Sequence, residues 1–270
     1  MRSLVPALAA LALAGFAAAC ADDGSFHPMD HVRHMQAWAG GADSKAITAA
    51  VADPARPDAD VKRDADRNPA EVLAFAGVHP GEKVADLIAG GGYFTRLFAK
   101  AVGPEGHVYV IQPAEIIKIA PVYLKNIQDA TAGYSNVTLI TDPLPQALKV
   151  PEPLDLVWTS QNYHDMHDPF MGPEDMAAVN KAVFDALKPG GVYIVLDHVA
   201  AAGSGLRDTN TLHRIDPEAV KREVLAAGFV FDGESKILRN PSDPLTANVF
   251  DKSIRGRTDQ FIFRFRKPKH

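Results

Sequence analysis

The sequence lacks the features that mark several classes of protein. Its 270 residues include a single cysteine, Cys20, so the chain can form no intrachain disulfide and no cysteine-based zinc site. The net charge of −5 leaves no basic excess, and nucleic acid is therefore not expected as a partner. No internal repeat or low-complexity tract is evident. With 47% apolar and 23% charged residues, the composition is that of a globular protein, long enough for one large α/β domain plus an extension.

The N-terminus also lacks a hydrophobic run that would comfortably span a membrane. Arg2 precedes an apolar stretch over residues 4–19, which is shorter than the roughly 20 residues of such a span and ends in small residues. The pattern predicts a signal peptide over residues 1–20 and export to the periplasm or cell envelope, with an uncleaved anchor as the alternative. Cys20 follows three alanines, as in a bacterial lipobox, although Ala17 stands where leucine or valine is usual. A lipid anchor at Cys20 is therefore the only membrane attachment that we expect.

Residues 21–68 are predicted to be an N-terminal extension, and residues 69–270 the main domain. His27, His31 and His34 could bind a metal through imidazole, but they lack a carboxylate–histidine pattern, which favours incidental histidines in a solvated segment. Residues 53–68 are rich in Pro, Asp and Arg. They could form a disordered linker, or an ordered arm over the mouth of a ligand site.

The most informative stretch is residues 82–95, which predicts a strand, a glycine turn and a helix. An apolar run from Val84 to Ile88 is typical of a buried parallel strand, and Gly90, Gly91 and Gly92 follow before a helix with amphipathic spacing. Such a helix N-terminus favours a phosphate or a carboxylate. A dinucleotide fingerprint would need a glycine at Thr95 and an acid at Gln112, so a nicotinamide dehydrogenase is disfavoured.

Two motifs in register carry a resemblance to a known family. The sequences VADLIAGGG (84–92) and LKPGGVYIVLDH (187–198) resemble the V-L-D-x-G-x-G-x-G and L-K-P-G-G-x-x-x-x-x-D motifs of class I S-adenosylmethionine (SAM) methyltransferases. Asp86, Gly90 and Gly92 match, whereas Ile88 replaces the first glycine. The resemblance covers about residues 69–267 and extends to bacterial predicted methyltransferases with a signal peptide and a G-G-G-Y loop. It implies a Rossmann-like sheet of seven strands, mostly parallel with an antiparallel last strand, and helices on both faces.

The resemblance also implies SAM as cofactor and methyl transfer to an unidentified small-molecule acceptor. The residues that would bind SAM are Asp86, Gly90, Gly91, Gly92 and Tyr93 at the methionine end, Gln112 at the ribose and Asp142 at the adenine. An amide at Gln112 can hydrogen-bond a hydroxyl, but without the charge that a carboxylate contributes. For Asp142, the start of a turn before a proline is an equally good interpretation.

The segment SQNYHDMHD (160–168) follows the strand predicted at 154–159 and is rich in reactive side chains. Ligands of open α/β sheets bind beyond the carboxyl ends of the strands, so Asn162, His164 and Asp165 are predicted to face the acceptor. His164 could act as general base, oriented by Asp165, or Asp165 could act itself; a histidine that only packs is the alternative. No metal site is predicted, because neighbours on one loop rarely all converge on an ion. His213 and Arg214 could also reach the mouth of the site, and a solvated loop is an equally good interpretation.

The sequence is also compatible with a second function. The substitutions at Ile88 and Gln112 weaken the SAM pattern, and SAM is a cytoplasmic metabolite by general expectation. The chain could therefore be an exported envelope or binding protein that retains the fold without catalysis. The sequence does not indicate an oligomeric state.

Overall fold

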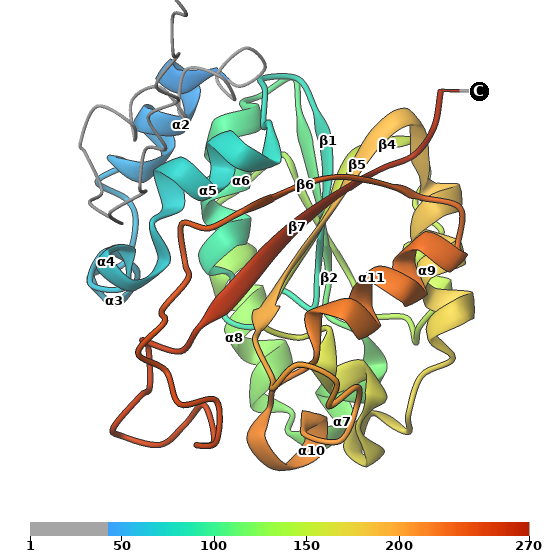
Figure 1. Ribbon diagram of the computed structural model, residues 1–270. Helices are drawn as coiled ribbons and strands as arrows, with labels where there is room; N and C mark the ends of the chain where they lie inside the picture. The colour runs from blue at the N-terminus through green and yellow to red at the C-terminus, as the bar shows by residue number, and fades with distance from the viewer. Residues whose placement is uncertain (1–42, 270) are drawn as a thin grey trace, which may run out of the picture.

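The computed structural model describes residues 43–269. The predicted signal peptide, Cys20 and the three N-terminal histidines lie outside this range. A seven-stranded sheet in the order β3-β2-β1-β4-β5-β7-β6 forms the centre of the protein (Figure 1). Its strands are β1 Lys83–Leu87, β2 His107–Ile111, β3 Val137–Ile140, β4 Leu154–Ser160, β5 Leu187–His198, β6 Val230–Ser235 and β7 Gln260–Arg266. Strand β7 runs antiparallel to both of its neighbours and β1 to β5 are parallel, which confirms the predicted fold.

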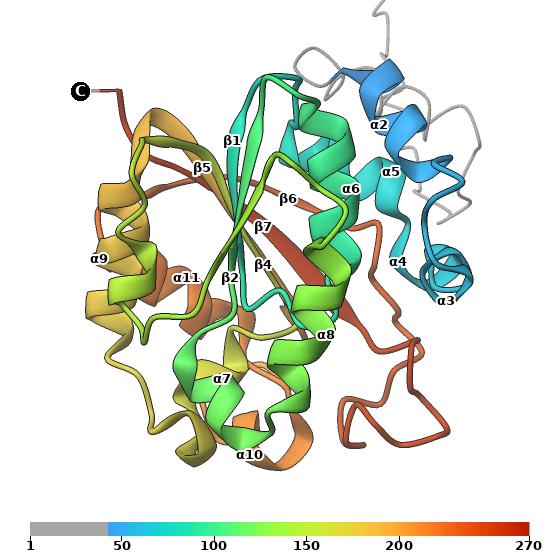
Figure 2. The ribbon, with the colours of Figure 1, turned by 180° about the vertical axis from the view of Figure 1, so that it is seen from behind.

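Helices cover both faces of the sheet (Figures 1 and 2). One layer contains α2 Ser44–Val51, α5 Pro69–Ala76, α6 Tyr93–Val102 and α8 Val122–Thr131, and the other contains α7 Ala114–Ile119, α9 Met176–Ala186 and α11 Pro217–Ala226. Successive side chains of a strand point to opposite faces, so Val84 and Trp158 pack in the first core and Ala85 and Val157 in the second. Burial on both faces explains why the strands read as continuous apolar runs.

Several element ends have local causes that are visible in the sequence. Helix α5 begins at Pro69 and stops at Gly77, whose φ is +78°, and Asp216 caps α11 through the amide of Glu218. Pro121 separates α7 from α8, because a proline inside a helical stretch cannot continue the helical hydrogen bonds. Residues 188–191, which carry a Pro-Gly-Gly sequence typical of a turn, lie within β5 and coincide with an irregularity in its pairing with β4.

The segment 53–68 is ordered and lies against α6. It contains two short helices, α3 Asp58–Val61 and α4 Asp64–Arg67. Asp60 forms an ion pair with Arg96 at 2.6 Å. Of the two alternatives, the structure has the ordered arm. The boundary at residue 69 stays a prediction, because α2 shares a core with α6.

The remaining short elements are η1 Gln146–Leu148, η2 His164–His167, η3 Pro169–Met171 and α10 Thr209–Leu212. Within residues 43–269, no helix has the length and apolar character needed to cross a membrane.

Candidate active site

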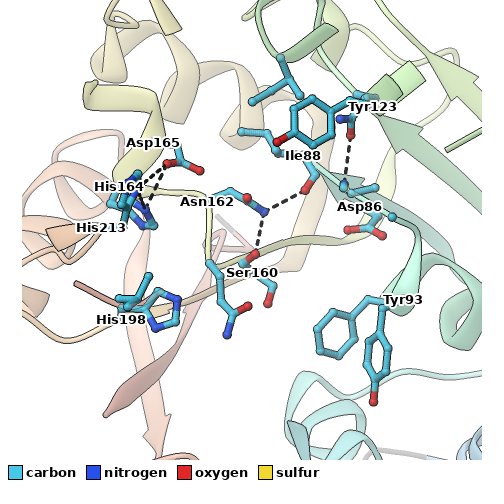
Figure 3. Close-up of a pocket in the computed structure, with 18 of the residues that line it drawn as sticks. Asp86, Ile88, Tyr93, Tyr123, Ser160, Asn162, His164, Asp165, His198 and His213 are labelled. Atoms are coloured by element: carbon cyan, nitrogen blue, oxygen red, sulfur yellow. Dashed lines mark hydrogen bonds and ion pairs between the residues drawn. The ribbon is translucent and has the colours of Figure 1, made fainter. Parts of the chain in front are cut away.

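A cleft of about 860 Å³ opens beyond the carboxyl ends of β1, β2, β4 and β5 (Figure 3). This is the edge at which open α/β sheets bind their ligands. The volume is within the range of about 300 to 1,000 Å³ that small-molecule sites occupy. Asp86 and Tyr93 lie on one side of the cleft, and His164, Asp165 and His213 lie on the other.

Ile88 turns the chain at the end of β1 in a left-handed conformation, with φ at +58°. This region is strained for a β-branched residue and easy for glycine. Ile88 thus adopts the kind of conformation for which the motif's glycine is suited. Its amide donates to the carbonyl of Ile111 at 2.8 Å, and its carbonyl accepts from Asn162 Nδ2 at 2.8 Å.

The three glycines have different environments. Gly90 and Gly91 line the cleft, and a Cβ atom on either would meet no heavy atom within 4 Å. Gly92 precedes α6 with φ at +78°, and a Cβ there would lie 2.7 Å from the Cβ of Ala130. Gly90 and Gly91 therefore leave room for a ligand, whereas Gly92 permits close packing of α6 on α8.

Two buried polar side chains line the cleft beside this turn. Asp86 is 3% exposed and accepts a 2.6 Å hydrogen bond from Thr95 Oγ1, and burial raises its pKa to about 6. Gln112 is fully buried, and its Oε1 accepts from the Gly90 amide at 3.0 Å. Its Nε2 has no hydrogen-bond partner within residues 43–269. A buried donor beside a cavity is available to a ligand.

Tyr93 connects the glycine turn to the arm. Its hydroxyl donates to Asp64 at 2.6 Å, and the guanidinium carbon of Arg67 lies 4.6 Å from its ring centroid. Arg67 also donates to Gln161 Oε1 at 3.2 Å, and burial lowers its pKa to about 10, so it stays charged at neutral pH. Arg67 and Arg63 both line the cleft. Sequence reasoning missed these arginines, because only the ordered arm brings them there.

His164 lies at the other side of the cleft, between two carboxylates. Its Nδ1 is 2.8 Å from Asp197 Oδ1 and its Nε2 is 3.1 Å from Asp165 Oδ1. Burial alone would lower the pKa of His164, but the charges of Asp197 and Asp165 and their hydrogen bonds raise it to about 10. At neutral pH the ring holds its proton, and it can act as a base only after this network changes.

Of the other predicted residues, Asn162 lies at the cleft and Asp142 does not. Asn162 lines the cleft, but its Nδ2 donates to the carbonyls of Ile88 and Ser160. Asp142 is exposed and is not among the cleft-lining residues, because it lies past the end of β3, the edge strand next to β2. The cleft instead includes His198, which follows Asp197 at the end of β5 and which sequence reasoning did not single out. Burial lowers the pKa of His198 to about 3, so its ring is neutral.

Parts of the chain are similar in sequence to known methyltransferases. No protein-family model matches the chain. A ubiquinone/menaquinone biosynthesis C-methyltransferase from Cupriavidus taiwanensis is 31% identical over 128 residues, which are 46% of this chain and 46% of that protein. A protein-L-isoaspartate O-methyltransferase from Methanosarcina mazei is 29% identical over 132 residues, which are 46% of this chain and 43% of that protein. The match thus spans less than half the length of these relatives.

A solved structure extends the likeness to nearly the whole fold. A SAM-dependent methyltransferase from Aquifex aeolicus superposes with a TM-score of 0.53 at 16% identity, over 83% of this chain and 98% of that chain. The strand order and the antiparallel β7 are those of the class I methyltransferase fold.

Proposed function

We propose that this protein binds SAM in the cleft and transfers its methyl group to a small-molecule acceptor. The fold and the distant sequence likeness to methyltransferases support this function. The observation that carries it is the pairing of the open turn at Gly90 and Gly91 with the buried, unpartnered Nε2 of Gln112. Both lie where β1 and β2 end, which is the ligand edge of the sheet.

The residues of the cleft fit the chemical groups of this cofactor. Gln112 Nε2 can donate to a ribose hydroxyl without disturbing the bond that Oε1 accepts from Gly90. Asp86 is largely ionised at neutral pH and offers a negative charge to the positively charged methionine end. The apolar side chains of Ile116, Ile119 and Tyr123 line the cleft and can cover an adenine ring in place of Asp142.

When bound, SAM supplies a methyl group that its positively charged sulfur has already activated. The protein then has to align the acceptor and exclude water. Arg67, which belongs to the arm, packs on the ring of Tyr93, and the two side chains cover one side of the cleft. Phe170 and Phe250 line the cleft with 40% and 57% of their surfaces exposed. These aromatic side chains favour a small acceptor with an apolar part.

The location of this reaction is part of the proposal. The apolar stretch before Cys20 supports export to the periplasm or envelope. We further propose that Cys20 carries a lipid anchor in the exported protein.

Calorimetric titration of the chain with SAM and with its demethylated product tests the proposal. We expect saturable binding that Gly91→Leu weakens at least tenfold, because the new side chain projects from the open turn into the cleft. Gly133→Leu is the matched control, since Gly133 is exposed, has equal room around its Cβ and does not line this cleft. A folded protein that binds neither ligand would contradict the proposal and favour an exported binding protein that retains only the fold.

A further inference from the structure

Three side chains from separate parts of the sequence converge on one point of the cleft. His164 and Asp165 belong to η2, and His213 follows α10 with φ at +53°. His164 Nε2 lies 3.1 Å from Asp165 Oδ1 and 3.4 Å from His213 Nδ1, and the third side, from His213 Nδ1 to Asp165 Oδ1, is 3.5 Å. Two nitrogens and one oxygen therefore form a nearly equilateral triangle (Figure 3).

We propose that this triangle is a binding site for a divalent transition-metal ion such as Zn²⁺. Histidine nitrogens and carboxylate oxygens bind Zn²⁺ at about 2.0–2.2 Å, so at octahedral or tetrahedral angles neighbouring ligand atoms lie about 2.8–3.6 Å apart. The sides of the triangle are close to this spacing. An ion can therefore bind with little movement of the three side chains.

Asp197 supplies a second, independent observation. It is fully buried on β5 and contacts His164 twice, at Nδ1 over 2.8 Å and at the main-chain amide over 2.9 Å. A carboxylate on one ring nitrogen fixes the imidazole so that the other nitrogen faces the ion, as metal-binding histidines usually require. His213 is held as well, because its ring packs edge-on against Phe250 with centroids 5.0 Å apart.

The arrangement differs from an ordinary ion-pair network. Both ring nitrogens approach the same oxygen of Asp165 and also approach each other. In an ordinary ion-pair network each ring nitrogen can have a carboxylate oxygen of its own, whereas here three ligand atoms share one point. A single ion at the centre satisfies all three atoms together.

The ligand set defines the kind of ion and its exposure. Imidazole suits Zn²⁺, Fe²⁺, Co²⁺ and Ni²⁺, whereas Mg²⁺ and Ca²⁺ prefer oxygen ligands alone. Three protein ligands leave a coordination position open, as catalytic sites do, and all three residues line the cleft. One consequence rests on the proposed methyl transfer. The acceptor would carry a hydroxyl or similar group that binds the ion, and the ion would lower the pKa of that group.

The test measures metal binding without methyl transfer. The full chain, stripped of metal with a chelator, is titrated with ZnCl₂ by calorimetry and with Co²⁺ by visible absorption. We expect one ion per chain, and a fall in affinity of at least about 100-fold in His213→Ala and in Asp165→Asn, the upper end of what changes to outer-shell partners cost. His107→Ala is the matched control, since this histidine is at the start of β2 and hydrogen-bonds Thr138.

Two further measurements keep the result unambiguous. A variant with His27, His31 and His34 all replaced by alanine should retain the ion, because these residues are not part of the triangle. If His213→Ala does not fold, judged by circular dichroism, His213→Phe keeps the packing against Phe250 and removes the ligand.

Several outcomes would overturn the site. Unchanged affinity in the folded His213 and Asp165 variants would place the ion elsewhere, and a folded wild-type chain that binds no ion would leave a protonated ion-pair cluster. Titration of the metal-free chain with SAM separates the two proposals. Cofactor binding without metal binding would contradict only the metal site, and the reverse would contradict only the proposed methyl transfer.

Discussion

The side-chain amide of Asn162 donates a 2.8 Å hydrogen bond to the main-chain carbonyl of Ile88. The same nitrogen donates to the carbonyl of Ser160 at 2.6 Å, so one side chain joins the ends of β1 and β4 beneath the cleft. Ile88 is held at φ +58°, a conformation that costs a β-branched residue of order 1–3 kcal/mol. The hydrogen bond from Asn162 therefore stabilises a strained turn at Ile88, where the family motif has its first glycine.

Asn162→Ala tests this relationship. It leaves two carbonyls without their donor, and we expect the free energy of unfolding to fall by about 2 kcal/mol, measured by urea denaturation. Ile88→Gly removes the strain but also a buried side chain, so the informative quantity is the coupling between the two changes. In a double-mutant cycle we expect a coupling of at least about 0.5 kcal/mol, because the Asn162 bond should matter less once glycine relaxes the turn. Strict additivity would show that Asn162 does not support the turn.

Two adjacent glycines should respond differently to the same substitution. Gly92→Ala introduces a Cβ 2.7 Å from that of Ala130, at a φ of +78°, and should destabilise the protein by about 1–3 kcal/mol. Gly91→Ala enters open space and should change stability by less than about 0.5 kcal/mol. Thermal and urea unfolding of the two variants compare them directly. Equal losses would mean that packing against Ala130 does not constrain the turn.

The buried carboxyl of Asp86 predicts a pH dependence of stability. Burial raises its pKa from 3.8 to about 6 in the folded protein, so the folded state binds the proton more tightly than the unfolded state. Its contribution to the free energy of unfolding is therefore fully present below about pH 4 and is lost as the pH rises to about 6. A shift of two units corresponds to about 3 kcal/mol.

Subtracting the Asp86→Asn profile isolates this contribution from that of other groups. The free energy of unfolding of both proteins is measured by urea denaturation from pH 4 to 8. We expect the difference between the two free energies to change mainly between pH 4 and 6. Thr95→Val removes a hydrogen bond to the ionised form and should move the transition to higher pH. A difference that does not vary with pH would contradict the raised pKa.

The arm should loosen when one of its contacts with α6 is removed. Tyr93→Phe removes the hydroxyl that donates to Asp64, and we expect a loss of about 1 kcal/mol and faster trypsin cleavage after Lys62 and Arg63. Tyr109→Phe is the matched control, because its hydroxyl donates to Glu152, away from the arm. Hydrogen exchange of residues 53–68 gives a second readout. Equal protection of the arm in both variants would show that Tyr93 does not hold it.

Much of the fold could be predicted because it depends on local patterns. Apolar runs doubly buried in a parallel sheet, Pro121 between two helices and the caps of α5 and α11 act over a few residues. The motifs at 84–92 and 187–198 added the number of strands and the antiparallel last strand through their resemblance to a family, whereas the order of the strands came from the structure. Roles within the site were harder to predict, because they depend on distances between elements. For example, Oε1 of Gln112 accepts a hydrogen bond from the main-chain amide of Gly90, and Gly92 permits the close packing of α6 on α8.

The sequence by itself determined the class of fold, the glycine turn and the edge of the sheet at which the cleft opens, since all three follow from the order and burial of strands and helices. Only the tertiary structure decided which side chains meet at that edge. It brought His213 to His164, across 49 positions of the chain, and placed Arg67 over Tyr93. It also left Asp142 outside the cleft. Such contacts depend on the path of loops and on the packing of the arm, and neither leaves a periodic signal in the sequence.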